Sequence, residues 1–281
     1  MNFSKKIFAF IKITRPTNVA ITFFVVVVAI IISGNVQSHL ITIVLASLAA
    51  ALVTAAGNII NDIYDVEIDK ISHPKRILVL GVLTKKEALF EYRFLNLIAV
   101  IISAYLSITL LIIVVISITL LFFYSYLFKQ KPLIGNIIIA FLAGMAFIYG
   151  GYVSGNPLSA IIPALFAFLV NLIREIVKDI QDIEGDSKLN YGTFPILYGI
   201  SKSKQLIVII TILLVVFTFY PFIFRLYKIE YFIMIMVFVN PLLILCIKFL
   251  YEQKWNNKLS FISSFYKLNM ILGLVAIYVG K

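Results

Sequence analysis

Long apolar runs recur along the whole chain, and short polar segments separate them. A helix needs about 20 predominantly apolar residues to cross a bilayer, and most of these runs approach that length. The run over residues 88–128 is long enough for two spans, with Ser107 and Thr109 marking a tight turn between them. The pattern therefore predicts nine spanning helices, near residues 17–34, 40–60, 88–107, 109–128, 133–153, 158–178, 204–222, 230–250 and 259–279.

Composition supports the same conclusion, since 62% of the residues are hydrophobic, 13% are charged and the mean hydropathy is +1.06. We therefore expect an all-α, polytopic membrane protein. The first residues show no cleavage site after a short apolar core, so no removable signal peptide is expected. The single cysteine, Cys246, lies in an apolar run, which excludes a disulfide framework and is typical of a small buried side chain.

The positive charges are distributed very unevenly between the two ends of the predicted helices. If the N-terminus is inside, the outer segments carry only Arg225, Lys228 and Lys281, and Lys267 lies within the last helix. All other Lys and Arg residues then fall on the inner side, as the positive-inside rule requires. We expect a cell-membrane protein with its N-terminus in the cytoplasm and its C-terminus outside. The net charge of +11 is explained by this topology, so no nucleic-acid partner is expected.

Nine of the thirteen carboxylates are concentrated in two segments, residues 61–69 and 175–186. Both segments fall on the cytoplasmic side of the predicted topology. Carboxylates at the edge of a bilayer are costly and usually functional. Other chemistry is sparse: His39 and His73 are not spaced as metal ligands, and no Ser-His-Asp arrangement or phosphate-binding glycine loop is present. Covalent catalysis is therefore not expected.

The two acidic segments share one spacing of aspartates, i, i+3 and i+7, which places the three side chains on one face of a helix. Like charges this close repel, so each face favours a divalent cation, and oxygen-only ligands suit Mg²⁺. Two such faces, opposed across a cavity, would hold Mg²⁺ around a diphosphate and neutralise it as a leaving group. The predicted metal ligands are Asp62, Asp65, Asp69, Asp179, Asp182 and Asp186. Four of them are predicted to be catalytic: Asp65, Asp69, Asp182 and Asp186.

Basic residues are interleaved with these acids. Lys178 stands one turn before Asp182 and Arg174 two turns before it, and Lys75 and Arg76 follow the first segment. A diphosphate carries about three negative charges, so cations beside the metals would help to bind it. Taken singly, Lys70, Lys75, Lys85 and Lys86 are ordinary charges of the cytoplasmic rim. Five glycines in or near the spans are expected to let helices pack closely: Gly57, Gly135, Gly144, Gly150 and Gly151.

At these residues the chain resembles the UbiA superfamily of intramembrane prenyltransferases. The first family motif, Asn-Asp-x-x-Asp-x-x-x-Asp, is matched by Asn61, Asp62, Asp65 and Asp69. The second motif, Asp-x-x-x-Asp, is matched by Asp182 and Asp186, with Asp179 as a further acid. The segment Thr14-Arg15-Pro16-Thr17-Asn18 resembles the family's opening before the first helix.

The resemblance covers nearly the whole chain and implies a single domain over residues 1–281. It implies nine helices around a central cavity with a cytoplasmic cap. The cap would hold the charged ends of a prenyl diphosphate and of an acceptor, and the prenyl tail would lie between apolar helices among membrane lipids. The substrate-binding residues that follow from the motifs and their neighbouring cations are Arg15, Asn18, Asn61, Arg76, Arg174 and Lys178.

Two departures from the family pattern change the picture. After the first motif, Pro74, Arg76 and Gly81 are retained but two prolines are absent, which affects the expected loop conformation. Arg174 stands where members of the quinone pathway often have Tyr, and an extra cation suits an acceptor that carries its own phosphate. The second segment resembles the archaeal branch of the family, which transfers geranylgeranyl from its diphosphate to the free hydroxyl of geranylgeranylglyceryl phosphate, forming the second ether bond of archaeal lipids.

Two alternatives remain open at this point. The first keeps the chemistry but uses an aromatic acceptor of quinone synthesis, attacked at carbon. The second is a transporter whose acidic sites bind a coupling cation, although transporter sites usually lie near the midplane at broken helices. A soluble prenyl chain elongase also uses two acidic motifs, but nine spans exclude it.

Overall fold

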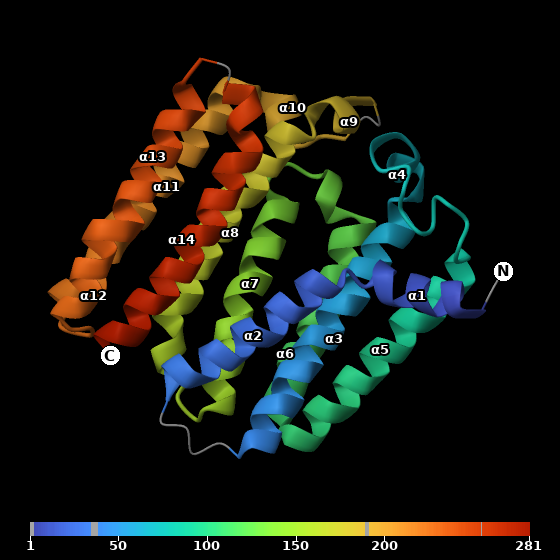
Figure 1. Cartoon of the computed structure of the whole chain (residues 1–281), viewed down its shortest axis with the longest axis horizontal. Coiled ribbons are helices and arrows are strands. Elements are labelled where there is room, and N and C mark those ends of the chain that lie inside the picture. Colours follow the sequence, from blue (N-terminus) through green and yellow to red (C-terminus); the bar gives the residue numbers. More distant parts are fainter. Residues whose placement is uncertain (1–2, 35–38, 189–190, 254) are drawn as a thin grey trace. The chain divides into compact units, whose positions relative to one another are not determined.

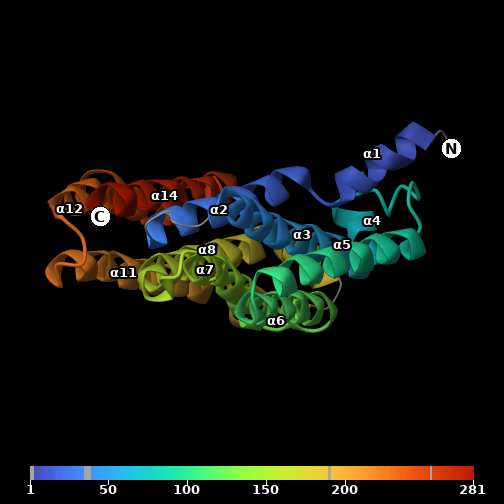
Figure 2. The same ribbon diagram turned by 90° about the horizontal axis from the view of Figure 1, so that it is seen from below.

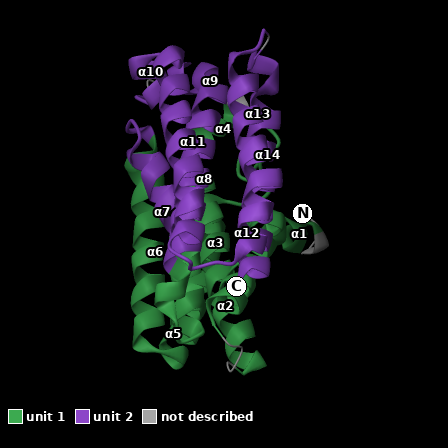
Figure 3. Ribbon diagram, turned by 90° about the vertical axis from the view of Figure 1, so that its left-hand side faces the viewer, with its two compact units in different colours: residues 1–129, 145–160 green, residues 130–144, 161–281 purple. Residues whose placement is uncertain are grey.

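The computed structural model describes residues 3–34, 39–188, 191–253 and 255–281. Within these ranges every regular element is a helix, and nine helices are long and apolar enough to cross a membrane. The predicted all-α class and number of spans are therefore confirmed, and the chain is a multi-pass membrane protein. The chain divides into two compact units, residues 1–129 with 145–160 and residues 130–144 with 161–281 (Figure 3). The single domain over residues 1–281 stays a prediction.

The helices that carry the acidic motifs are longer than the apolar pattern predicted. The second span was expected over 40–60 but continues to Tyr64, and the sixth, expected over 158–178, continues to Gln181. Hydropathy falls at the first acidic residue, whereas the backbone hydrogen bonds of a helix continue through polar side chains. The third span starts earlier than expected because Thr84 and Glu87 form a capping box, in which each side chain accepts the other's backbone N–H.

Unit 1 is organised around α3, which packs against α2, α5 and α6 (Figure 1). Small residues make these close contacts possible, since much of the buried face of α3 consists of alanines between Ala46 and Ala56. The helices that unit 1 contains wholly or in part are α1 (Phe3–Ile13), α2 (Pro16–Ser33), α3 (Leu40–Tyr64), α4 (Val66–Ser72), α5 (Lys85–Leu106), α6 (Ile108–Tyr126), η1 (Phe128–Gln130), α7 (Ile134–Val153) and η2 (Pro157–Ala160).

The predicted turn between the third and fourth spans is at Ser107. Its backbone is extended, and its hydroxyl accepts the N–H of Leu110, so that Ser107 caps α6. A small apolar cluster at the other end of unit 1 joins α1 and the segment after α4 to α3 and α5. It consists of Ala9, Ile13, Ile59, Ile77, Leu83 and Ala88. This cluster fixes the two segments that carry Arg15 and Arg76.

Four of the glycines expected at close contacts lie at such contacts. A Cβ at Gly57 would come within 2.9 Å of Leu121, and one at Gly144 would come within 2.9 Å of the Ala164 carbonyl oxygen. At Gly150 it would meet Ala29 at 2.5 Å, and Gly151 is similarly close to Ala160. The prediction is therefore confirmed at these four positions.

Unit 2 is organised around α8, which packs against α11 and α14. Figure 2 shows α12 and α14 in one layer of this unit and α8 and α11 in the other. Besides the first part of α7, unit 2 contains α8 (Ile161–Gln181), α9 (Ile183–Lys188), α10 (Phe194–Tyr198), α11 (Ile200–Ile223), α12 (Ile229–Met234), η3 (Ile235–Val239), α13 (Asn240–Tyr251), η4 (Trp255–Lys258) and α14 (Leu259–Gly280).

The eighth span was expected over 230–250 and runs over Ile229–Tyr251, with an irregular turn inside it. A π-helical turn over Ile235–Val239 separates α12 from α13. Pro241 follows two residues after this turn and has no backbone N–H, so the regular hydrogen-bond ladder cannot pass through it unchanged. The interruption leaves Asn240 buried, where its amide group hydrogen-bonds Thr218 on α11.

Candidate active site

The first acidic motif lies at a junction between two helices. Asp62 is in the last turn of α3, Asp65 connects α3 to α4, and Asp69 is in α4. The backbone at Asp65 leaves the helical region, with φ −90° and ψ 0°. Hydrogen bonds still bridge the junction, because the N–H of Asp65 donates to Asn61 and that of Asp69 donates to Asp65. The spacing therefore gathers the carboxylates as predicted, but across the junction of α3 and α4 rather than on one continuous helical face.

The second motif has the same design. Asp182 stands between α8 and α9, its N–H donates to Lys178 at 2.9 Å, and the N–H of Asp186 donates to Asp182 at 2.9 Å. In both units the middle aspartate of the triplet is therefore the junction residue. The other two aspartates lie on the flanking helices. The expectation that the two acidic segments meet at one diphosphate stays a prediction.

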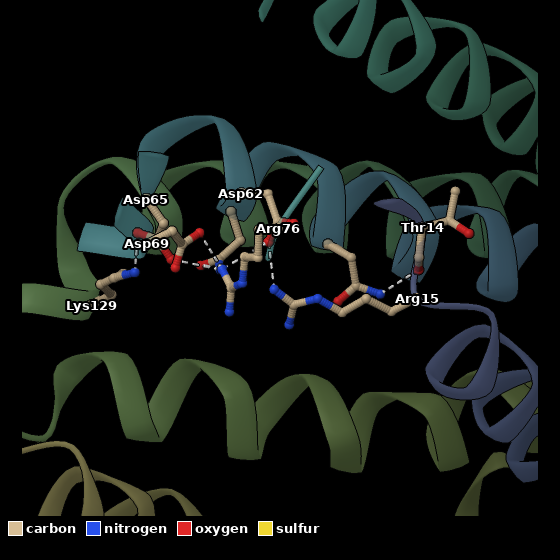
Figure 4. A network of polar contacts seen from close by, with 9 residues as sticks. Thr14, Arg15, Asp62, Asp65, Asp69, Arg76 and Lys129 are labelled. Carbon is tan, nitrogen blue, oxygen red and sulfur yellow. Dashed lines mark hydrogen bonds and ion pairs between the residues drawn. The ribbon is translucent and has the colours of Figure 1, made fainter. Parts of the chain in front are cut away.

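Cations surround the carboxylates of the first motif. Arg15 Nη2 donates to Asp62 Oδ1 at 2.5 Å, and Arg76 Nη1 donates to the same oxygen at 3.1 Å. Arg76 also donates to Asp69 Oδ2 at 2.5 Å, so it bridges two aspartates (Figure 4). Both arginines were predicted as substrate ligands, and the structure places both on the first motif.

Asp65 has two partners of its own. Lys129, in η1, forms an ion pair with Asp65 (Figure 4). The side-chain amide of Asn61 donates to the other carboxylate oxygen at 2.8 Å. Three aspartates are thus balanced by three cations, Arg15, Arg76 and Lys129.

Burial makes this balance necessary. Asp62, Asp65 and Asp69 are 5%, 5% and 3% exposed. An unpaired charge buried to this extent is strongly destabilising, whereas a paired and hydrogen-bonded one can be tolerated. Burial raises the pKa of Asp69 above its usual value, although the Arg76 guanidinium acts in the opposite direction. The first motif is therefore a dense cluster of charges whose acidic members need cationic partners.

A turn before α2 places the Arg15 side chain at the first motif. This residue has φ 55°, a left-handed conformation that is uncommon outside glycine, and Pro16 begins α2 directly after it. The Asn58 side chain donates to the Thr14 carbonyl at 2.8 Å and ties this turn to α3. Asn18, also predicted to bind substrate, lies in the first turn of α2 with an exposed side chain.

The segment that follows α4 presents Arg76 without the prolines that the family pattern contains. Hydrogen bonds from the N–H of Leu80 to Arg76 and from Val82 to Ile77 close it into turns. The retained Gly81 has φ 67°, which favours glycine. Buried Ile77 belongs to the cluster that fixes this segment. The segment is therefore an ordered turn, although the two prolines of the family pattern are absent.

The second motif is more exposed and has different partners. Asp182 is exposed and Asp186 is partly buried. Asp179 accepts a hydrogen bond from Asn136 on α7 at 2.9 Å. Lys178 pairs with Glu175 at 2.5 Å. Arg174 donates to Asn171 on the same helix at 2.8 Å.

The donor chemistry of the two motifs fits Mg²⁺. The six predicted ligands are carboxylates, the oxygen donors that this ion prefers, and Mg²⁺ commonly uses one or two of them together with substrate phosphates. In the part of the chain that the structure describes, no three His, Cys, Asp or Glu side chains are gathered closely enough to enclose one metal ion. In the first motif, cationic side chains contact the carboxylates instead.

Two partners of the aspartates were not singled out from the sequence, Lys129 and Asn136. Lys129 was counted only as a topological charge, and it stands 64 residues from Asp65. Asn136 stands 43 residues from Asp179. Both are polar residues near those ends of the fourth and fifth spans that are predicted to be cytoplasmic. That position is the only sequence signal that could have identified them.

Comparison with known proteins gives one consistent result. A model of the UbiA prenyltransferase family matches residues 22–270. Digeranylgeranylglyceryl phosphate synthase of Methanosphaera stadtmanae is 34% identical over 271 residues, which cover 96% of this chain and 98% of the relative. The synthase of Saccharolobus solfataricus is 32% identical over 276 residues, covering 97% and 96% of the two chains.

Solved structures agree with these relatives. A structure from work on digeranylgeranylglyceryl phosphate synthase in membranes is 32% identical, with a TM-score of 0.81 and 98% of each chain covered. A UbiA homolog from Archaeoglobus fulgidus bound to GPP and Mg²⁺ is 18% identical, with a TM-score of 0.70 and 96% and 99% of the two chains covered. The similarity to the Archaeoglobus fulgidus structure is a similarity of fold.

Proposed function

The chain belongs to the UbiA prenyltransferase family, and we propose that it makes the second ether bond of archaeal membrane lipids. It transfers geranylgeranyl from geranylgeranyl diphosphate to the free hydroxyl of geranylgeranylglyceryl phosphate. The relatives named for this activity match nearly the whole chain, which supports the choice of acceptor. The protein is thus a membrane enzyme, a prenyltransferase.

The observation that carries the reaction class is the triplet of aspartates built at a helix junction in each unit. In the first motif all three carboxylates are buried and held in fixed positions by cations. Groups fixed in advance stabilise a developing charge without reorganising during the reaction, and such stabilisation is often the largest contribution to catalysis. A chain of mostly apolar helices has no structural need for such a cluster.

The reaction breaks one bond and forms one. The bond between the allylic carbon and the diphosphate oxygen breaks, and the electron pair leaves with the diphosphate. The acceptor hydroxyl then bonds to the electron-poor carbon and loses its proton to a nearby carboxylate or to the departing diphosphate. No dedicated histidine base is required, so His39→Ala and His73→Ala are expected to stay active.

The residue roles follow from charge and position. Asp62, Asp65, Asp69, Asp179, Asp182 and Asp186 are proposed as ligands for Mg²⁺, and four of them, Asp65, Asp69, Asp182 and Asp186, as catalytic residues. When bound, Mg²⁺ would neutralise negative charge on the diphosphate as it leaves. Asn61, Arg15, Asn18, Arg76 and Lys178 are proposed to bind substrate. Arg15 and Arg76 already neutralise Asp62 and Asp69, and a polyanion entering the site would compete for their N–H donors.

Arg174 is proposed to bind the phosphate of the acceptor. Its guanidinium is permanently charged and planar, which suits a phosphate with several oxygens. Its Nη1 donates to Asn171, while Nε is buried with no hydrogen-bond partner among the described residues. We expect Arg174→Ala to raise the KM for geranylgeranylglyceryl phosphate more than the KM for geranylgeranyl diphosphate.

The test is incubation of the purified protein with geranylgeranyl diphosphate and Mg²⁺, once with geranylgeranylglyceryl phosphate and once with 4-hydroxybenzoate. Mass spectrometry should detect the diether only with the first acceptor. A parallel sample treated with a chelator should lose turnover and regain it when Mg²⁺ is added back. Prenylation of 4-hydroxybenzoate in place of the glyceryl phosphate would assign the protein to quinone synthesis, and full turnover after chelation would contradict the role of the metal.

A further inference from the structure

The contact between α8 and α14 contains charged and polar side chains within two membrane-spanning helices. α8 contributes Arg174, Glu175 and Lys178, and α14 contributes Lys267. Lys267 is the ninth residue of α14, about 12 Å along the helix from its first residue. Ionisable side chains at such positions are costly and usually mark a functional site. Neither the proposed metal ligands nor the topology explains Lys267.

The two helices are in register at these residues. The Asn171 side chain on α8 donates to the Met270 sulfur on α14 at 3.5 Å. The helices are antiparallel, because two spans lie between them in the order of the chain. One turn further along α8 is Arg174, and one turn back along α14 is Lys267. Arg174, Glu175 and Lys178 are accordingly the charged groups that act electrostatically on Lys267.

This cluster carries an excess of positive charge that one phosphate group can neutralise. Three cations, Arg174, Lys178 and Lys267, face a single acid, Glu175, so the net charge is about +2. Glu175 is 9% exposed and already pairs with Lys178 at 2.5 Å, so Lys267 is not needed as its counterion. A phosphate monoester carries about −1.5 to −2 charges at pH 7. A metal ion would be repelled by the same cluster.

We infer that Lys267 is a specificity-determining residue that holds the phosphate of the acceptor together with Arg174 and Lys178. This inference rests on the proposed function, since it assigns the acceptor's phosphate to a place in unit 2. The three cations reach this place from two helices, which fixes the phosphate more firmly than residues of α8 alone. An acceptor without phosphate would gain nothing from Lys267.

The experiment compares steady-state kinetics of the wild type with Lys267→Gln, Lys267→Met and Lys267→Arg. A hydrogen bond to a charged group contributes about 1.5–3 kcal/mol. The KM for geranylgeranylglyceryl phosphate should therefore rise about tenfold to a hundredfold in the two neutral variants. The KM for geranylgeranyl diphosphate should be unchanged, and Lys267→Arg should retain most of the affinity. Lys248→Gln, which removes an exposed lysine from α13, is the matched control and should behave as the wild type.

A second acceptor, geranylgeranylglycerol, separates phosphate binding from a general structural effect. It lacks the phosphate, so its KM should be the same in the wild type and in the neutral variants. The preference for the phosphorylated acceptor over geranylgeranylglycerol should fall by the same factor by which the KM for the phosphorylated acceptor rises. If the wild type makes the diether, two outcomes would overturn the role of Lys267 and leave the proposed function intact. One is an equal rise in KM for both acceptors, and the other is an unchanged preference in both neutral variants. A wild type that does not use the phosphorylated acceptor would overturn the proposed function as well.

Discussion

Arg76 contacts two buried aspartates at once, Asp62 and Asp69, so its removal leaves two carboxylates short of a cation. Breaking a buried ion pair costs about 3–5 kcal/mol because the remaining charge is left without compensation. We expect Arg76→Gln to lower the melting temperature of the purified protein in the absence of Mg²⁺. Adding Mg²⁺ should recover part of the loss, because the ion can supply the missing positive charge.

The matched control is Lys70→Gln in the preceding helix. Lys70 also pairs with an acid, Glu67, but both side chains are more than half exposed, at 55% and 71%. Exposed pairs contribute little to stability, so this variant should melt like the wild type. Equal losses in the two variants, or an Arg76→Gln loss that is insensitive to Mg²⁺, would contradict the assignment of Arg76 to the motif.

The aspartates can be separated from their acidic neighbours by activity. Asp65→Ala, Asp69→Ala, Asp182→Ala and Asp186→Ala should each lower turnover at least about a hundredfold, as expected when stabilisation of transition-state charge is lost. Glu67 and Glu184 are exposed acids inside the same two segments, so Glu67→Ala and Glu184→Ala serve as controls. The measurement is initial rate of diether formation. If the two controls lose as much activity as the aspartate variants, the cluster acts through net charge and not through these carboxylates.

For single residues, the sequence predicted the clustered aspartates but not the cationic side chains that pair with them. The i, i+3, i+7 spacing is local, and a helical repeat converts it directly into a cluster of carboxylates. The pairing of Lys129 with Asp65 depends on the path of the chain through two spans, which no local pattern encodes. Arg15 and Arg76 could be named because family motifs contain them, whereas their bonds to Asp62 required the fold.

Among the helices, both acidic motifs occupy the same position, a break after a long buried span. Hydropathy predicted the spans well, since it measures the property that decides insertion. It misplaced the ends of α3 and α8, because a helix continues through polar residues until its backbone pattern changes. The breaks at Asp65 and Asp182 were not predicted, and neither was the π-helical turn before Pro241.

Close helix packing gives a prediction at this scale. A Cβ at Gly150 on α7 would lie 2.5 Å from the Ala29 Cβ and 3.0 Å from the Ile30 backbone nitrogen on α2, and neither neighbour can rotate away. We expect Gly150→Ala to destabilise the protein by about 1–3 kcal/mol, as overpacking of a core does. Gly273 on α14 has no atom within 4 Å of the corresponding position. Gly273→Ala should therefore leave the melting temperature unchanged or raise it slightly, because alanine favours a helix.

Thermal melting followed by size-exclusion chromatography in detergent distinguishes the two variants. Both substitutions add the same methyl group within a spanning helix, so a difference between them reports the local space. A Gly150→Ala protein as stable as the wild type would mean that α2 and α7 are less closely packed than described.

For the whole molecule, the distribution of charges predicts an orientation that can be tested in cells. The buried Cys246 is replaced by alanine, and single cysteines are introduced at Lys75, Lys188 or Asn156, all exposed. Lys75 and Lys188 follow the first and second acidic motifs, whereas Asn156 lies in the segment between α7 and α8, where residues 154–159 carry no Lys or Arg. A positive-inside arrangement puts the first two positions in the cytoplasm and the third outside.

A membrane-impermeant maleimide added to intact cells should label Asn156→Cys and leave Lys75→Cys and Lys188→Cys unlabelled until the membrane is permeabilised. The protein without cysteine controls for background, and labelling after permeabilisation shows that each introduced thiol is reactive. Labelling of both lysine positions from outside would reverse the topology. Labelling of only one would place the two acidic motifs on opposite sides of the membrane, and then they could not act on one diphosphate. The expected pattern, with both motif segments protected together, is what a single cytoplasmic reaction requires.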